Sequence, residues 1–99
     1  MRAAYRHERA FREEMLVLVL VILAAAWLGR SPVQRALLIG SWILVMVVEL
    51  INSAIEAVVD RFGPEQNELA GRAKDFGSAA VFCTILLAAL VWALILPFQ

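Results

Sequence analysis

The chain has 99 residues, of which 63% are hydrophobic, and its mean hydropathy is +0.80. Soluble domains are usually about 45–50% apolar, so this composition indicates an integral membrane protein. Lys plus Arg and Asp plus Glu balance at 9 each, which argues against a nucleic-acid-binding protein and its basic excess. We therefore expect an all-α membrane protein whose residues 1–99 form one domain with no nucleic-acid partner.

The first segment, residues 1–14, is charged and contains four arginines. It predicts a short helix at or near the membrane interface, which leads into a first span at about residues 11–29. The uninterrupted apolar run from Met15 to Leu28 is short for a span, because about 20 residues are needed to cross a bilayer. We therefore expect the helix of the first span to begin before this run.

Gly29-Arg30-Ser31-Pro32 separates the first two predicted spans. Ser31 is a favourable N-cap, Pro32 suits the first helical position, and Gln34 completes a Ser-x-x-Gln capping box. The connection is short, so a second helix at about residues 33–61 should pack antiparallel to the first. Gly63-Pro64 then stops this helix.

A third predicted span covers about residues 69–98. Small residues recur along it at intervals of three and four, which is typical of a close-packing seam between membrane helices. These residues are Ala70, Ala73, Gly77, Ala80 and Thr84.

The distribution of Lys and Arg predicts the orientation of the three spans. The N-terminal segment has its four arginines, and the second loop with its flanks has Arg61, Arg72 and Lys74, whereas the first loop region has only Arg30 and Arg35. Three spans place the N-terminus and the second loop on the same side, and the positive-inside rule makes that side cytoplasmic. We expect a multi-pass protein of a bacterial inner membrane, with its polar chemistry facing the cytoplasm.

Acidic residues form a stripe on the second predicted helix. Glu49, Asn52, Glu56 and Asp60 fall on one face at about 100° per residue, opposite a face that contains Leu50, Ile51, Val58 and Val59. An acid at the centre of a bilayer costs about 2.5–3.5 kcal/mol on insertion scales, so an acid within a span indicates a functional site by default. We interpret Asp60 as a structural or solvated acid near Arg61 or Arg72.

The acids allow more than one chemistry. Carboxylate oxygens are the ligands that Mg²⁺ prefers, and a cation held between Glu8, Glu56 and a nucleotide would neutralise phosphate charge. A separate carboxylate could accept a proton from an attacking hydroxyl group, and Lys74 could pair with phosphate. A buried acid could equally carry protons or cations in a small transporter. Spacing and composition alone leave the kinase and the transporter hypotheses open.

Two motifs resemble one family. Residues 49–61, ELINSAIEAVVDR, followed by ELAGRAKDFGSAA at residues 68–80, closely resemble the bacterial integral-membrane diacylglycerol kinases. The N-terminal Arg2-Ala-Ala-Tyr5 and the run from Glu8 to Glu14 fit the same family. The resemblance extends over nearly the whole chain, and an unrelated three-helix membrane protein would not be expected to carry both motifs.

The resemblance implies a trimer of three-span subunits with active sites shared between neighbours. The reaction it implies is transfer of the γ-phosphoryl group of MgATP to the primary hydroxyl of diacylglycerol, which yields phosphatidic acid. By position, Glu49 resembles the catalytic base, and Glu8 and Glu56 resemble the carboxylates that hold Mg²⁺. The residues in nucleotide-binding positions are Glu8, Asn52, Glu56, Glu65, Asn67, Lys74 and Asp75. Those in lipid-substrate positions are Arg2, Phe11, Arg12, Glu14, Glu49 and Ser78.

The chain departs from the family pattern at two places. Gram-negative family members usually carry an N-terminal amphipathic surface helix before the segment that starts here at Met1-Arg2, so either the true start lies upstream, or the chain is shortened, or the site is more open than usual. A loop position that often holds His is Asn67, which can form hydrogen bonds but cannot carry a positive charge. Undecaprenol kinases have the same chemistry with another lipid alcohol, and this acceptor remains the alternative to diacylglycerol.

Overall fold

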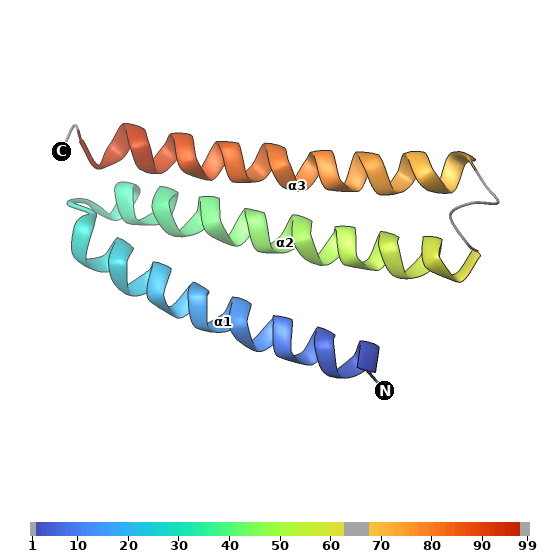
Figure 1. Cartoon of the computed structure of the whole chain (residues 1–99). Coiled ribbons are helices and arrows are strands. Elements are labelled where there is room, and N and C mark those ends of the chain that lie inside the picture. The colour runs from blue at the N-terminus through green and yellow to red at the C-terminus, as the bar shows by residue number, and fades with distance from the viewer. Residues whose placement is uncertain (1, 63–67, 98–99) are drawn as a thin grey trace.

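The computed structural model describes residues 2–62 and 68–97, including their side chains except at 2–8, 10, 11 and 62. These residues form three helices, α1 (Arg2–Leu28), α2 (Pro32–Phe62) and α3 (Glu68–Ile95). Figure 1 shows them running side by side with alternating direction, so that the start of α1, the end of α2 and the start of α3 share one end. The all-α prediction is confirmed.

α2 and α3 are long and apolar enough to span a membrane, with mean hydropathies of 2.0 and 2.5 over their most apolar windows. α1 has no comparable apolar stretch of 18 residues with at most two charged side chains, because the 18 residues that end at Leu28 include Arg12, Glu13 and Glu14. The charged N-terminal residues do not form a separate helix, since α1 continues without a break from Arg2 to Leu28. The protein is therefore a membrane protein with two evident spans, preceded by one helix that is charged at its start and apolar at its end.

The turn between α1 and α2 follows from its sequence. The Gly29 amide donates to the Ala25 carbonyl at 2.8 Å, and a Cβ at Gly29 would lie 2.7 Å from Arg35 Cγ, so only glycine fits without a shift. The Gln34 amide donates to Ser31 Oγ at 3.1 Å, as predicted for an N-cap. In a capping box the Gln34 side chain would accept from the backbone N–H of Ser31, but here Gln34 Oε1 accepts from the backbone N–H of Arg30 at 2.8 Å.

Three side-chain contacts hold α2 and α3 antiparallel along their length. The Trp92 indole donates to the Leu38 carbonyl at 3.1 Å, Asn52 lies against Gly77, and Lys74 Nζ donates to Asp60 Oδ1 at 3.0 Å. Moving along α2 toward its end, from Leu38 to Asn52 to Asp60, the contacts on α3 move toward its start. The small core lies along this interface and beside the first turn, and its buried apolar residues are Ala25, Leu38, Val45, Met46, Val59 and Ala88.

The predicted seam on α3 is confirmed in part. Gly77 is buried against α2, and Ala70, Ala73 and Thr84 are half-buried, but Ala80 is exposed within one chain. A second difference concerns α2, where Val59 is buried instead of sharing the exposed face of Leu50, Ile51 and Val58. Helices that cross at an angle do not keep one stripe in contact over their whole length, which explains the exposure of Ala80. The prediction placed Val59 on the wrong face, because at 100° per residue Val59 lies about 180° from Leu50 and about 20° from Asn52.

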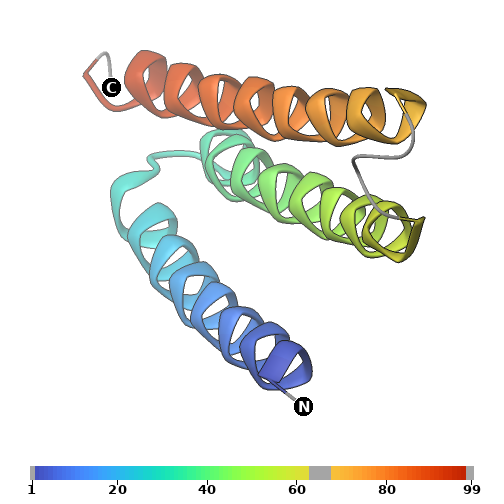
Figure 2. The ribbon, with the colours of Figure 1, turned by 45° about the vertical axis from the view of Figure 1, so that its right-hand side comes forward.

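α1 diverges from the other two helices. Figure 2 shows it close to α2 near the turn at Gly29 and further from α2 toward its N-terminus. The divergence leaves the N-terminal part of α1 further from α2 than its C-terminal part. The fold thereby separates a closed α2–α3 interface from an open α1–α2 interface.

Candidate active site

The predicted polar stripe on α2 faces the other two helices. Glu49, Asn52 and Glu56 are half-buried, whereas Leu50, Ile51 and Val58 on the outer face are 50%, 55% and 60% exposed. Successive polar residues on the stripe are three or four positions apart, so about one helical turn separates each from the next. The structure thus confirms that these residues share an inward face, and it assigns a different neighbour to each of them.

Glu49 lies opposite Glu14 of α1. The two carboxyl groups are neighbours, and both line a groove of about 310 Å³ together with Glu13, Val17, Trp42 and Met46. Neighbouring carboxylates repel each other unless a proton or a cation lies between them. The pair therefore marks a place where a proton can be held or exchanged, at the deep end of the stripe.

Asn52 lies between α2 and α3. Its side-chain amide rests on Gly77, where a Cβ would overlap Oδ1 and would lie 3.1 Å from Cγ. Asn52 Oδ1 is buried and has no hydrogen-bond partner among the described residues. Gly77 thus makes room for a polar side chain whose acceptor is left unused by the protein itself.

Lys74 joins the shallow end of the stripe. Its Nζ lies 3.0 Å from Asp60 Oδ1, and the Glu56 carboxylate is close enough to attract the same ammonium group. Asp60 is exposed and forms an ion pair, as expected for a structural or solvated acid, but its partner is Lys74 of α3, whereas Arg72 pairs with Glu68 at 3.2 Å on its own helix. Asp60 is therefore a positioning partner of Lys74.

The other predicted site residues divide into two groups. Arg12, Asp75 and Ser78 are exposed and do not join the inward stripe within one chain. Arg12 lies two residues from Glu14, about 200° around α1, and contributes to a shallow surface groove with Arg9, Glu13 and Leu16. The side chains of Arg2, Glu8 and Phe11 are not among those described, and Glu65 and Asn67 lie outside the described residues.

One lining residue was missed by sequence reasoning. Trp42 lies seven residues before Glu49, hence on the same face, and its indole nitrogen is buried without a partner in the described part of the chain. An aromatic residue within an apolar run carries no signal by itself. The position of Trp42 two turns before Glu49 could have drawn attention to it.

The described donors fit a divalent cation in chemistry, although they do not form a complete site. No three Asp, Glu, His or Cys side chains gather closely enough to hold a metal ion within the part of the chain that the structure describes. Glu56 makes no ion pair within 4 Å among those residues, so its hard carboxylate oxygens are free to accept a cation. A substrate phosphate would supply further oxygen ligands to such an ion.

Comparisons with known proteins point to one family. The sequence model of a family described as prokaryotic diacylglycerol kinase matches residues 1–96. A protein named diacylglycerol kinase from Escherichia coli K12 is 52% identical over 97% of this chain and 79% of its own length. Proteins of the same name from Pseudomonas aeruginosa and Haemophilus influenzae are 47% and 45% identical, over 95% and 99% of this chain and 76% and 83% of their own lengths.

Proposed function

Because the chain belongs to the prokaryotic diacylglycerol kinase family, we propose that it transfers the γ-phosphoryl group of MgATP to the primary hydroxyl of diacylglycerol. The product is phosphatidic acid, and ADP leaves. One observation carries the assignment of roles: Glu49 and Glu14 lie deep between α1 and α2, whereas Glu56, Asp60 and Lys74 gather two to three turns nearer the polar end.

The depth of each group follows from α3. Residues 76–95 contain no charged side chain, and 20 helical residues rise about 30 Å, which matches the hydrocarbon thickness of a bilayer. The membrane boundary then lies near Asp75, beside Lys74 and its neighbour Glu56. Glu49 lies two turns further in, about 10 Å below that boundary. A lipid hydroxyl can reach this depth, and a triphosphate bound near Glu56 would extend its γ-phosphoryl end inward to meet that hydroxyl.

We assign the proton to Glu49. In the proposed step the hydroxyl oxygen of the lipid attacks the γ-phosphorus, the bond to the ADP oxygen breaks, and the hydroxyl proton passes to a Glu49 carboxylate oxygen. Glu14 faces Glu49 in the same groove. Glu14 therefore affects how strongly Glu49 holds that proton, and it adds a polar wall for the glycerol group.

The nucleotide belongs to the shallow end of the stripe. Lys74 would pair with phosphate oxygens as a point charge, and Asp60 and Glu56 orient its ammonium group toward the α2 face. Asn52 lies between the two ends, with a buried acceptor that is free for a substrate group. We retain Asp75, Glu65 and Asn67 as nucleotide contacts on the strength of the family resemblance.

We assign Mg²⁺ to Glu56 and Glu8. Glu14 faces Glu49 across the α1–α2 interface. Glu8 lies six residues before Glu14 on α1, and Glu56 lies seven residues after Glu49 on α2. Antiparallel helices keep these two positions at a similar depth. The cation, when bound, neutralises phosphate charge and lowers the barrier to phosphoryl transfer.

We further propose a homotrimer of three-span subunits in the bacterial inner membrane, with shared sites that face the cytoplasm. Within one chain the predicted lipid contacts Arg12 and Ser78 are exposed and do not line the groove of Glu49, which supports a site completed by a neighbouring subunit. Arg2 and Phe11 belong to the same proposed set of lipid contacts. The apolar outer faces of all three helices suit a lipid environment.

A transfer assay with two acceptors tests the proposed function. The purified protein is placed in lipid with MgATP, and diacylglycerol and undecaprenol are offered separately while phosphate transfer is followed. We expect phosphatidic acid as the faster product. Faster transfer to undecaprenol would reassign the acceptor, and absence of transfer to either lipid would refute the kinase assignment.

A further inference from the structure

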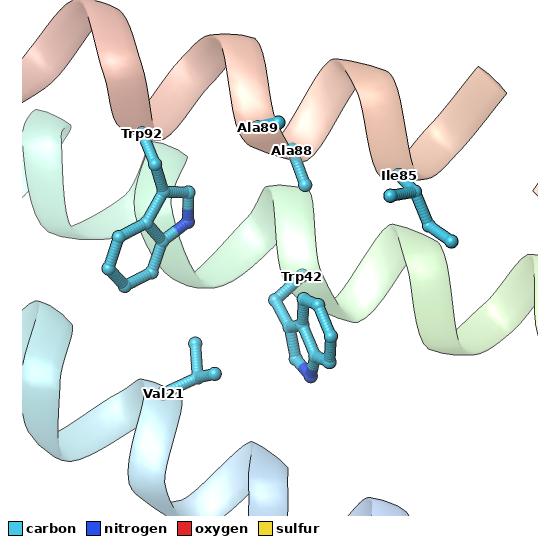
Figure 3. A pocket seen from close by; sticks show the side chains of 6 residues that line it. All are labelled: Val21, Trp42, Ile85, Ala88, Ala89 and Trp92. Carbon is cyan, nitrogen blue, oxygen red and sulfur yellow. The ribbon is translucent and has the colours of Figure 1, made fainter. Parts of the chain in front are cut away.

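Two tryptophans with different hydrogen bonding line an apolar groove of about 310 Å³ between the three helices. Figure 3 shows Trp42 of α2 and Trp92 of α3 facing Val21 of α1, and the remaining lining residues are Ile85, Ala88 and Ala89. The Trp92 indole donates to the Leu38 carbonyl, so its polar group is satisfied by the protein. The Trp42 indole nitrogen points toward α1 and, among the described residues, has no acceptor although it is buried.

An unpaired buried donor is costly, since leaving it unsatisfied forfeits about 1–3 kcal/mol, and buried tryptophan N–H groups usually find a partner. Trp42 also lines the groove that contains Glu14 and Glu49. Trp42 lines both grooves, so the acidic groove and the apolar groove share the N–H donor of its indole. A ligand that spans both must therefore have a hydroxyl end, an acceptor next to it and an apolar tail.

We propose that Trp42 is the ester-recognition residue of the lipid substrate. Its indole N–H donates to an acyl ester carbonyl of diacylglycerol, and the acyl chain beyond that ester lies in the groove between Val21, Ala88 and Trp92. This inference rests on the proposed function, and it adds to that function a contact that determines the specificity for the lipid. Trp42 and Glu49 are two helical turns apart, about 10 Å along α2, which leaves room for the glycerol group between their side chains.

The geometry favours a lipid over a second copy of the chain as occupant of this groove. The groove shares Trp42 with the groove of Glu49 and Glu14, and α1 diverges from α2 toward its N-terminus, as Figure 2 shows. A backbone carbonyl inside a helix of another subunit is already bonded within that helix and would be shared by the Trp42 donor, as the Leu38 carbonyl is shared by Trp92. An ester carbonyl is an acceptor that enters the apolar region without any internal partner.

The first experiment compares diacylglycerol with its dialkyl ether analogue, which keeps the hydroxyl and the chains but lacks both ester carbonyls. We expect the unaltered protein to prefer the ester by about fivefold in kcat/KM, the value of one neutral hydrogen bond. Trp42→Phe should reduce this ratio to about 1 by lowering kcat/KM for the ester alone. Trp92→Phe should keep the ratio, because the Trp92 donor is already used by the Leu38 carbonyl.

Trp27→Phe is the matched control, since Trp27 is 89% exposed near the end of α1 and touches neither groove. It should leave both the activity and the ratio unchanged. Equal use of ester and ether by the unaltered protein would overturn the proposal while leaving the kinase function in place. An equal loss for both lipids in Trp42→Phe would likewise overturn it, because that result indicates a structural role.

A binding measurement decides the matter independently of catalysis. In the variant that combines Trp27→Phe and Trp92→Phe, Trp42 is the sole tryptophan, since the chain has 3 in all. Diacylglycerol with bromine atoms near the ester end of its chains, in phosphatidylcholine vesicles, should quench Trp42 fluorescence at mole fractions where brominated phosphatidylcholine does not. Equal quenching by the two lipids would refute a specific site, whether or not phosphate transfer is seen.

Discussion

The contact between Gly77 and Asn52 predicts a substitution that separates activity from stability. In Gly77→Ala, the new Cβ would overlap the Asn52 side-chain amide and lie 3.1 Å from its Cγ. The obstacle is the end of a side chain, so Asn52 can turn aside at a cost of about 0.5–1.5 kcal/mol for an unfavourable rotamer. Alanine regains about 0.5–1 kcal/mol over glycine within a helix. The two effects nearly cancel, so the free energy of unfolding should change by less than about 1 kcal/mol.

Activity should respond much more strongly than stability. A displaced Asn52 no longer presents its buried acceptor to the site, and small misplacements near reacting groups cost about 10- to 100-fold in rate. Gly71→Ala is the matched control on the same helix, because a Cβ at Gly71 meets nothing within 4 Å. It should add about 0.5–1 kcal/mol of stability and keep the activity.

Unfolding in detergent, followed by tryptophan fluorescence, and phosphate transfer to diacylglycerol provide the two readouts. The double variant Asn52→Ala/Gly77→Ala closes a thermodynamic cycle. Once the Asn52 amide is removed, Gly77→Ala should cost no further activity and should stabilise like Gly71→Ala. If Gly77→Ala lowered the rate by the same factor in the Asn52→Ala background, its effect would not pass through Asn52, and the reasoning would be refuted.

Three further predictions concern single contacts. Glu56→Gln should raise the Mg²⁺ concentration needed for half-maximal activity by about tenfold or more, because removing one ligand or supporting group at a metal site typically costs 10- to 100-fold in affinity. An unchanged Mg²⁺ titration would show that Glu56 is not part of the metal site. Asp60→Asn should raise the KM for MgATP several-fold, yet it should alter stability by less than about 1 kcal/mol because the ion pair with Lys74 is exposed. The control Glu68→Gln breaks an exposed pair within α3 and should alter neither the KM nor the stability. Equal KM changes in the two variants would contradict the positioning role of Asp60. Trp92→Phe should lower the free energy of unfolding by about 0.5–1.5 kcal/mol through loss of its bond to the Leu38 carbonyl, and an unchanged denaturation midpoint would speak against that bond.

The helices could be predicted from the sequence because their signals are local. The Ser31 cap, the glycine at position 29 and the inward face of Glu49 and Asn52 all depend on residues within a turn or two of each other. The early start of α1 was predicted as well, because the apolar run from Met15 to Leu28 is short for a span, and the charged segment before that run belongs to the same helix. A helix whose backbone bonds are already satisfied can cross that change in polarity without a break.

The neighbours of the site residues could not be predicted in the same way. The pairing of Lys74 with Asp60 and the meeting of Glu14 with Glu49 depend on how antiparallel helices slide past one another, and no spacing rule within one helix sets that register. Arg72 was an equally plausible partner for Asp60 until the structure showed it paired with Glu68 on α3. The unpaired nitrogen of Trp42 is likewise a property of packing.

The most direct test of the proposed division between a deep proton acceptor and a shallow nucleotide site is Glu49→Gln, assayed for both phosphate transfer and nucleotide binding. Glutamine has nearly the same shape as glutamate but cannot accept the hydroxyl proton. We expect transfer to diacylglycerol to fall by about 10²–10⁴-fold, the usual value of a general base, while the Kd for MgATP stays within about twofold. Near-normal transfer in Glu49→Gln, or loss of MgATP binding in a folded protein, would contradict the assignment of the proton to Glu49.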